Sequence, residues 1–263
     1  MRKSLKVYFQ TSIGAATGTS PMCKHACGMI RNMKRNSNLK FLRVFILLPV
    51  MFTMLLTGCG NSDQGKPVQF EKQEGQRLVR INIRDFGAVT FRLIPNEQEE
   101  IVNGFIDKCK SGFYNGTSFY NIIEDYLMIG GRDQDDPATV SAKASDKLYP
   151  FKGSLCLNIS GDGKCSLNSF IIITIDKGQL DNIEELVEHK GFTFSDYIKF
   201  GYKTELSEEE LTAFRTYGGA PWLYGHTVVL GQAIEGMDVL ENISKIHTDE
   251  PETEIIIDSI ETD

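Results

Sequence analysis

Gly-Phe-Tyr-Asn-Gly-Thr-Ser-Phe-Tyr-Asn-Ile-Ile, residues 112–123, is the stretch that decides the class of fold. Its Asn115-Gly116 pair is typical of a turn, because these two residue types reach backbone conformations that others avoid. The run 119–123 behind the turn is apolar and has the length of an ordinary strand. The stretch therefore predicts a turn that leads into a strand.

Similar strand signals recur on both sides of this stretch. On its N-terminal side, apolar residues alternate with polar ones over 79–83 and 89–93, and Asp85-Phe86-Gly87 between them predicts a hairpin with one buried face. On its C-terminal side, short apolar runs bounded by Gly, Asp or Asn predict five more strands. They are 127–129, 154–159, 170–175, 227–233 and 255–260.

Two helices separate these strands. Apolar residues recur at i, i+3, i+4 and i+7 from Val102 and predict a helix over about 96–111. A second helix is predicted over 237–246. Many short strands with two separated helices favour a mainly β, closed barrel over a parallel α/β sheet.

A different pattern interrupts the strands between about 177 and 220. Apolar residues at helical spacing predict three helices there. They cover 183–189, 194–200 and 207–217. The last one carries a capping-box signature, in which Ser207 is followed three residues later by Glu210. We interpret the region as a helical insertion within a single domain, which extends over 77–263.

The N-terminal region differs from the rest of the chain in charge. The 263 residues are 41% hydrophobic and 24% charged, a composition that suits a globular domain and excludes a collagen-like or disordered chain. The net charge is −7, but residues 1–58 hold nine basic and no acidic residues, so the remaining 205 carry −16. Such asymmetry is typical of a processed targeting segment or of a nucleic-acid-binding arm.

The order of features from Met33 onward favours a targeting segment. A basic stretch precedes the apolar run 45–56, which is too short to span a hydrocarbon core, since that requires about 20 residues. Leu56-Thr57-Gly58-Cys59 then resembles the bacterial lipobox, whose cysteine is acylated and becomes the first mature residue. An ordinary secretory signal that ends near a chance cysteine is the alternative.

These features predict a lipoprotein. Residues 1–58 are expected to form a leader and signal peptide, with Met33 as an alternative start, and Cys59 is expected to carry the lipid. Polar residues 60–76 are expected to be a flexible tether. The domain would then lie at the cell membrane, on the exported side.

The remaining cysteines give no sign of a metal site. Cys23, His25 and Cys27 do not complete a tetrahedral shell and lie in the predicted leader. Cys156 could form a disulfide with Cys165 in an exported protein, or it could be a small buried hydrophobe, as could Cys109.

Five motifs occur in the order of one known family. Residues 112–123 are similar to G-F-Y-D-G-T-x-F-H-R-V-I, and residues 126–131 to F-M-x-Q-G-G. Three further motifs follow these two in the chain. They are 153–158 with 168–171, 222–231 and 235–239. On these motifs the region 77–263, apart from the insertion, resembles the cyclophilin family of peptidyl-prolyl isomerases.

The resemblance implies an eight-stranded antiparallel barrel capped by two helices, and rotation about the X–Pro peptide bond as the reaction. Rotation of an amide has a barrier of about 18–20 kcal/mol, while the cis and trans X–Pro forms are close in energy. Only the barrier has to fall, so no cofactor, metal or nucleophile is expected. An apolar slot for the proline ring and donors that weaken amide conjugation are sufficient.

The apolar residues of the family's proline site are retained. By resemblance, the proline-pocket positions are occupied by four side chains and a further wall position by a tryptophan. The four are Tyr126, Leu127, Phe170 and Leu223, and the tryptophan is Trp222.

The polar residues of the site depart from the family pattern. Asn121 replaces the catalytic arginine, and Ile129 replaces the glutamine that orients it. Asn168 stands for the glutamine of S-Q-F-F and can still bind a peptide backbone. The Asn121 amide can donate, but without charge or reach. Removing one preorganised donor typically slows catalysis roughly 10²–10³-fold, so reduced turnover is expected.

Two nearby basic side chains are candidates to replace that arginine. Arg132 follows the glycine pair and could swing inward. His226 precedes Thr227, which occupies the family's histidine position, and strand alternation turns His226 to the opposite face.

Two functions remain open from the sequence. The first is a membrane-anchored peptidyl-prolyl isomerase that assists the folding of exported proteins by acting on their proline-containing segments. The second is a non-catalytic proline-peptide-binding chaperone or interaction module. The acidic domain argues against nucleic-acid binding. A solute-binding lipoprotein lacks support because the two-lobed α/β pattern is absent. The domain is expected to be a monomer.

Overall fold

The computed structural model describes residues 66–72, 74–94, 98–133, 138–246 and 254–263. The predicted leader, the lipobox and Cys59 lie outside these residues. Within the described part, no helix combines the length and the apolar character that a membrane crossing requires.

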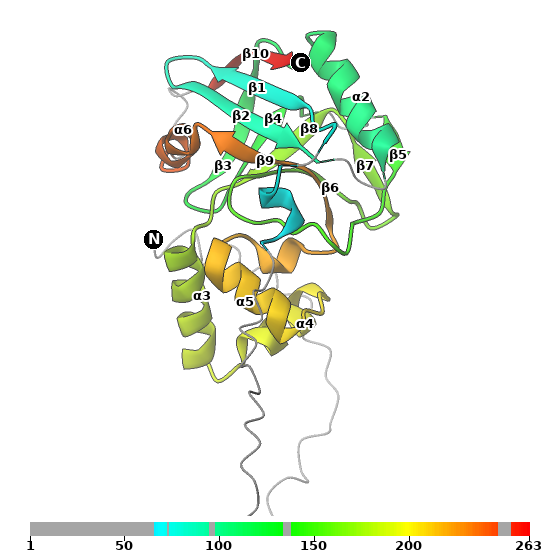
Figure 1. Ribbon diagram of the computed structural model, residues 1–263. Coiled ribbons are helices and arrows are strands. Elements are labelled where there is room, and N and C mark those ends of the chain that lie inside the picture. The colour runs from blue at the N-terminus through cyan, green and yellow to red at the C-terminus, as the bar shows by residue number, and fades with distance from the viewer. Residues whose placement is uncertain (1–65, 73, 95–97, 134–137, 247–253) are drawn as a thin grey trace, which may run out of the picture. The chain divides into compact units, whose positions relative to one another are not determined.

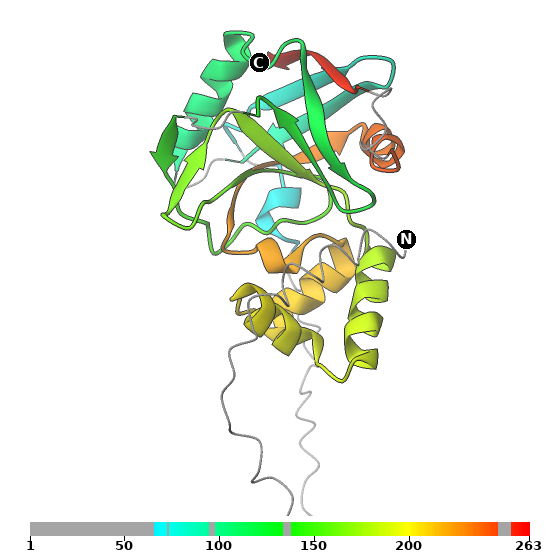
Figure 2. The same ribbon diagram turned by 180° about the vertical axis from the view of Figure 1, so that it is seen from behind.

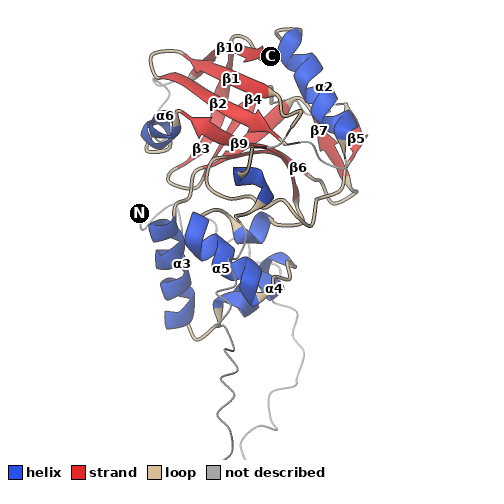
Figure 3. Cartoon of the chain, viewed as in Figure 1, coloured by secondary structure: helices blue, strands red, loops and turns tan. Residues whose placement is uncertain are grey.

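Eight strands close into a barrel in which every hydrogen-bonded pair is antiparallel (Figures 1 and 3). The order around the barrel is β1-β10-β3-β4-β8-β6-β9-β2. The strands are β1 (Leu78–Ile83), β2 (Gly87–Leu93), β3 (Thr117–Ile123), β4 (Leu127–Gly131), β6 (Ser154–Asn158), β8 (Ser169–Ile173), β9 (Thr227–Glu235) and β10 (Ile256–Thr262). The predicted mainly β, closed eight-stranded barrel is confirmed.

Two helices close the barrel interior. α2 (Glu99–Lys110) contributes Phe105 and α6 (Met237–Ile243) contributes Leu240, and both side chains are fully buried in the interior cluster. The ring of Phe105 meets that of Phe170 edge to face, with centroids 6.1 Å apart. Each helix buries one apolar face, so the two predicted capping helices are confirmed.

The predicted helical insertion lies between β8 and β9. It contains α3 (Lys177–His189), α4 (Phe194–Tyr202) and α5 (Glu208–Tyr217), and the short helix η2 (Pro221–Leu223) follows. Figures 1 and 2 show these three helices together on the side of the barrel away from α2.

Capping boxes set where two of the insertion helices begin. The predicted box of Ser207 and Glu210 is present at the start of α5. α3 begins earlier than predicted, because Asp176 and Gln179 form a second box. That second box precedes the apolar residues of α3, so the apolar pattern alone did not reveal it.

The insertion covers part of the outer surface of the barrel. A second hydrophobic cluster joins outward-facing barrel residues to buried residues of the insertion, and each is at most 8% exposed. The barrel contributes Leu127, Cys156, Ile171, Ile173 and Val229, and the insertion contributes Leu180, Val187, Phe194, Ile198, Leu211 and Phe214. The strands beneath are therefore buried on both faces, which explains their continuous apolar runs.

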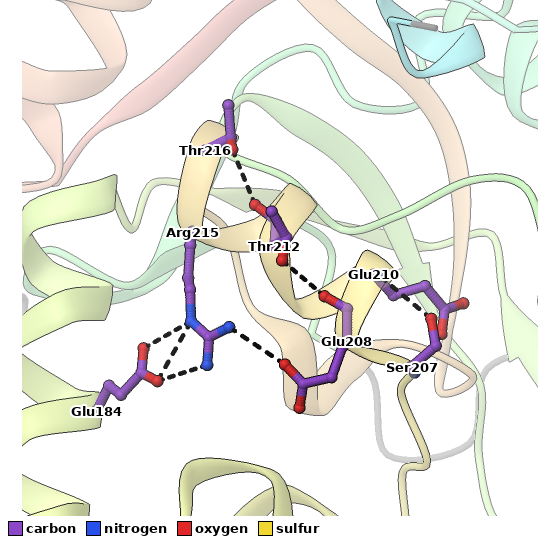
Figure 4. A network of polar contacts seen from close by, with 7 residues as sticks. All are labelled: Glu184, Ser207, Glu208, Glu210, Thr212, Arg215 and Thr216. Atoms are coloured by element: carbon purple, nitrogen blue, oxygen red, sulfur yellow. Dashed lines mark hydrogen bonds and ion pairs between the residues drawn. The ribbon is translucent and has the colours of Figure 1, made fainter. Parts of the chain in front are cut away.

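An ion-pair network joins α5 to α3 near the surface of the insertion (Figure 4). Nη2 of Arg215 lies 2.6 Å from Oε1 of Glu184, and Nε of Arg215 donates to the same carboxylate. Oε2 of Glu208 lies 3.7 Å from Nη1. The Glu184 carboxylate, as the main cause, raises the pKa of Arg215. The guanidinium thus links the first and third helices of the insertion.

The packed domain begins earlier than predicted. The polar stretch 60–76 predicts a flexible tether, yet η1 (Val68–Phe70) is built into the domain. Gln69 is 0% exposed, and its Nε2 donates to the carbonyl of Tyr149 at 3.0 Å and to Oε1 of Gln232 at 2.9 Å. A buried glutamine has no hydrophobic signature, so the sequence pattern did not reveal this contact.

Two further features of the described residues differ from the sequence-based predictions. A small sheet of β5 (Thr139–Ser141) and β7 (Lys164–Ser166) was not predicted. Cys109, Cys156 and Cys165 are free and buried, so the disulfide alternative is wrong.

Candidate functional site

A row of paired residues crosses the outer face of β3, β4, β8 and β6. Asn121 pairs with Ile129, Ile129 with Ile171, and Ile171 with Cys156. Side chains directly opposite each other on neighbouring strands point to the same face. Asn121 is exposed whereas Cys156 is fully buried, so the row runs from solvent into the second hydrophobic cluster. The position of the family's arginine is thus at the open edge of an apolar surface.

A bulge in β3 places two polar side chains at this edge. The pairing with β4 shifts register between Phe119 and Asn121, and both Phe119 and Ile122 belong to the interior cluster. The two residues between them, Tyr120 and Asn121, therefore both lie toward the outer face. Sequence reasoning missed Tyr120, because the apolar run 119–123 does not show which of its side chains face outward.

Tyr120 is also the titratable group closest in sequence to Asn121. Burial is the main cause that raises the pKa of Tyr120; a hydrogen bond with Ser169 lowers it and the charge of Asp133 raises it. The phenol therefore stays protonated at neutral pH and can donate. The edge of the site offers neutral donors, an amide and a phenol, from neighbouring positions of one strand.

Four of the five predicted substrate-binding residues come together in the second hydrophobic cluster. Leu127 is 5% and Trp222 6% exposed, while Tyr126 and Leu223 are half-buried. The indole nitrogen of Trp222 donates to the phenolic oxygen of Tyr126, and the two ring centroids are 5.7 Å apart. The β3–β4 turn and η2 are thus bound to each other at the site.

The backbone around Tyr126 is fixed by the end of β8. The carbonyl of Tyr126 accepts the amides of Thr174 at 2.9 Å and Ile175 at 3.2 Å. Asp125 adopts a left-handed conformation, with φ of 54°, which completes the tight turn before β4. The backbone at Tyr126 is consequently fixed in the absence of a ligand.

Phe170 does not lie with the other four predicted residues. It is 0% exposed inside the barrel, where its ring meets those of Phe105, Tyr114 and Phe119 edge to face. Its neighbour Ile171 faces outward in the row described above. Successive side chains of a strand point to opposite faces. Aligning the motif one residue out of register therefore assigns each side chain to the wrong face. The outward apolar residue of β8 is Ile171.

Asn168 immediately precedes the first residue of β8 and is 6% exposed. Its carbonyl accepts the amide of Arg132 at 2.8 Å, and its own amide donates to Ser166 Oγ at 3.0 Å. Asn168 is therefore placed at the Gly131 end of β4, whereas Asn121 pairs further along, with Ile129.

Neither nearby basic side chain takes the place of the missing arginine. The Arg132 guanidinium lies over the ring of Phe113, 4.8 Å from its centroid, and Nε donates to the carbonyl of Phe113. Nε2 of His226 lies 3.1 Å from the carbonyl oxygen of Tyr202. His226 is not one of the paired strand residues that form the row from Asn121 to Cys156. The charge supplied by an arginine in the family is not reproduced by these two side chains.

Comparisons with known proteins agree with this fold. The family model described as "Cyclophilin type peptidyl-prolyl cis-trans isomerase/CLD" matches residues 78–262. A relative from Staphylococcus saprophyticus is 30% identical over 71% of this chain and 92% of its own length, and one from Staphylococcus aureus is 26% identical over 73% and 95%. Both are named "Putative peptidyl-prolyl cis-trans isomerase".

Solved structures with a similar trace include a cyclophilin-type peptidyl-prolyl cis-trans isomerase from Cryptosporidium parvum. Its crystal structure gives a TM-score of 0.49 at 19% identity and covers 72% of this chain and 98% of that chain. A structure of the same protein in the presence of the dipeptide Ala-Pro gives 0.44 at 20% identity, over 70% and 96%.

The barrel is closed and antiparallel, and the family model spans it from residue 78 to residue 262. The chain belongs to the cyclophilin-type peptidyl-prolyl cis-trans isomerase family.

Proposed function

We propose that this chain is a membrane-anchored peptidyl-prolyl isomerase that assists the folding of exported proteins, with lower turnover than a family member that keeps the arginine. The observation that carries the proposal is the outer-face pair of Asn121 and Ile129, beside the cluster that contains Tyr126 and Trp222. The apolar residues of the proposed site are clustered, while its polar part offers an amide instead of a guanidinium.

The proposed reaction needs few groups. The apolar cluster holds the proline ring, and the Asn121 amide donates to the backbone of the twisted peptide bond. Holding the substrate in a suitable geometry and donating to the charge that develops on twisting both lower the barrier. Catalytic roles for Asn121 and Asn168, and binding roles for Tyr126, Leu127, Trp222 and Leu223, are part of this proposal. In this proposal Ile171 takes the binding role that the resemblance assigns to Phe170.

Membrane attachment rests on the sequence of the leader. A basic stretch, an apolar run and Leu56-Thr57-Gly58-Cys59 follow one another in the order of a lipoprotein signal. Acylation of Cys59 would hold the domain at the exported face of the cell membrane, where proline-containing segments of newly exported chains are the substrates.

A second function is favoured by the same pair of residues. Because Asn121 and Ile129 stand at these positions, the chain lacks both the family's arginine and the glutamine that orients it, while the apolar cluster is kept. A non-catalytic module that binds proline peptides would need only the apolar cluster.

A peptide isomerisation assay on the purified full chain separates the two functions. We expect acceleration above the spontaneous rate, and an affinity for proline peptide that falls on the order of fivefold in Leu223→Ser, because half-buried apolar surface is lost. Ile234→Ser, at an exposed isoleucine outside the cluster, serves as the matched control and leaves affinity unchanged. Binding without acceleration supports the non-catalytic module, and no binding at all overturns both functions.

A further inference from the structure

Three aromatic rings run from the barrel onto the insertion. The centroid of Tyr126 is 5.7 Å from that of Trp222, and the centroid of Trp222 is 5.9 Å from that of Tyr202 in α4. The interplanar angles are 37° and 31°, so the three rings are tilted by similar amounts along the row. We call these three residues the aromatic row.

Hydrogen bonds hold the aromatic row in place at both ends. Trp222 Nε1 donates to the hydroxyl of Tyr126, and the carbonyl of Trp222 accepts from Thr204 Oγ1 at 3.3 Å. The hydroxyl of Tyr202 lies 3.2 Å from that of Tyr197, and the two rings meet edge to face. Rings that are fixed before binding lose little conformational entropy when a ligand covers them.

Exposure shows which members of the row face a ligand. Trp222 is 6% exposed and forms the centre, whereas Tyr126 and Tyr202 are half-buried on either side of it. Tyr126 belongs to the proposed proline site, so the row continues that site onto the insertion. Fixed aromatic rings are the surfaces that extended proline-containing peptides bind, with the ring planes packed against apolar side chains.

We infer that Tyr202 is a specificity-determining residue that contacts the substrate residue flanking the proline and favours an aromatic or large apolar side chain there. The inference rests on the proposed function, because it assumes that a peptide occupies the Tyr126 end of the row. The occupant is the substrate polypeptide, since the row is continuous with the proposed proline site.

The test measures selectivity, not activity alone. The purified full chain and its Tyr202→Ala variant are assayed for isomerisation on peptides that carry either phenylalanine or alanine beside the proline, on each side in turn. We expect the wild type to prefer phenylalanine on one side, and Tyr202→Ala to reduce that preference by about three- to tenfold, the value of one aromatic contact.

A matched variant and two physical readouts distinguish the outcomes. Phe200→Ala removes a ring that is 76% exposed on the same helix and does not belong to the aromatic row, so its selectivity stays that of the wild type. Tyr202→Phe keeps the ring and keeps the preference. Circular dichroism and thermal unfolding check that each variant is folded.

Unchanged selectivity in a folded, active Tyr202→Ala overturns the inference and leaves the proposed function intact. A wild type that neither binds nor isomerises any proline peptide instead overturns the proposed function. If Tyr202→Ala changes the sedimentation of the protein and not its selectivity, the row is covered by a second copy, which also overturns the inference.

Discussion

The indole nitrogen of Trp222 donates a hydrogen bond to the phenolic oxygen of Tyr126, 96 residues earlier in the chain. This bond connects the β3–β4 turn to η2, on the far side of the insertion in sequence. A nearly buried indole N–H that loses its acceptor keeps the cost of its desolvation, about 1–3 kcal/mol.

Replacing Tyr126 with phenylalanine tests that bond. We expect Tyr126→Phe to lower the free energy of unfolding by about 1–3 kcal/mol, because the indole N–H is left without its partner. Chemical denaturation followed by tryptophan fluorescence measures the change, since Trp222 is the sole tryptophan of the chain. Tyr224→Phe removes a hydroxyl that donates to the backbone carbonyl of Asp146 at the surface, and we expect its effect to be smaller. Equal effects of the two variants would contradict a special role for the Trp222–Tyr126 bond.

The Arg215–Glu184 pair is expected to contribute to the stability of the insertion. Charge-assisted hydrogen bonds are worth about 1.5–3 kcal/mol when buried, and partial exposure of this pair reduces that to roughly 1 kcal/mol in Arg215→Gln. Lys177→Gln breaks an exposed pair with Asp181 and should cost less than about 0.5 kcal/mol. Urea denaturation compares the two, and a Lys177 variant as costly as the Arg215 variant would be inconsistent with this ranking.

Restoring the family's polar residues is expected to raise isomerase activity. In the double variant Asn121→Arg with Ile129→Gln, a guanidinium and its orienting amide stand opposite each other on β3 and β4. We expect kcat/KM to rise up to roughly 10²-fold, the usual value of one preorganised donor. Asn121→Lys supplies charge without the planar fork, and its gain should be smaller. A double variant that binds peptide but is no faster than the wild type would count against a shared mechanism.

The three described thiols are expected to resist alkylation in the native protein. Burial raises the pKa of Cys109 to about 12 and that of Cys165 to about 11, and it also raises the pKa of Cys156. At pH 8 the thiolate, which is the reactive form, is therefore scarce in the folded state. Iodoacetamide treatment followed by peptide mass spectrometry should label these cysteines only in denaturant. Rapid native labelling of Cys156 would show that the insertion opens readily.

The same thiols make stability depend on pH in the alkaline range. The unfolded chain releases these protons near pH 8.5, whereas the folded protein keeps them to about pH 11–12. The folded state therefore binds more protons in that window, so the free energy of unfolding should decline as pH rises above about 8.5. Denaturation midpoints at pH 7.5 and pH 10 measure the decline, and alanine at Cys109 should make it shallower.

The barrel could be predicted from the sequence because its strands and helices differ in apolar period. Alternation over β1 and β2, and helical spacing in α2, give signals that do not depend on distant parts of the chain. The residues of the site were harder to predict from the sequence. Phe170 and Ile171 are both apolar, so only the pairing of β8 with β4 shows which of them faces outward. Tyr120 was missed because a bulge places two successive residues of β3 on the outer face, and an apolar run does not reveal a bulge.

The buried contacts of Gln69 constrain the order in which the domain can be completed. Gln69 bonds Gln232, 163 residues later, so this contact cannot form until nearly the whole chain has been made. Closing so long a loop is slow unless other contacts first bring its ends together, and β1, β2 and β9 are the strands that do so. The segment nearest the predicted membrane anchor is therefore expected to lock in late, and nascent chains that stop before Gln232 should leave it open to proteases.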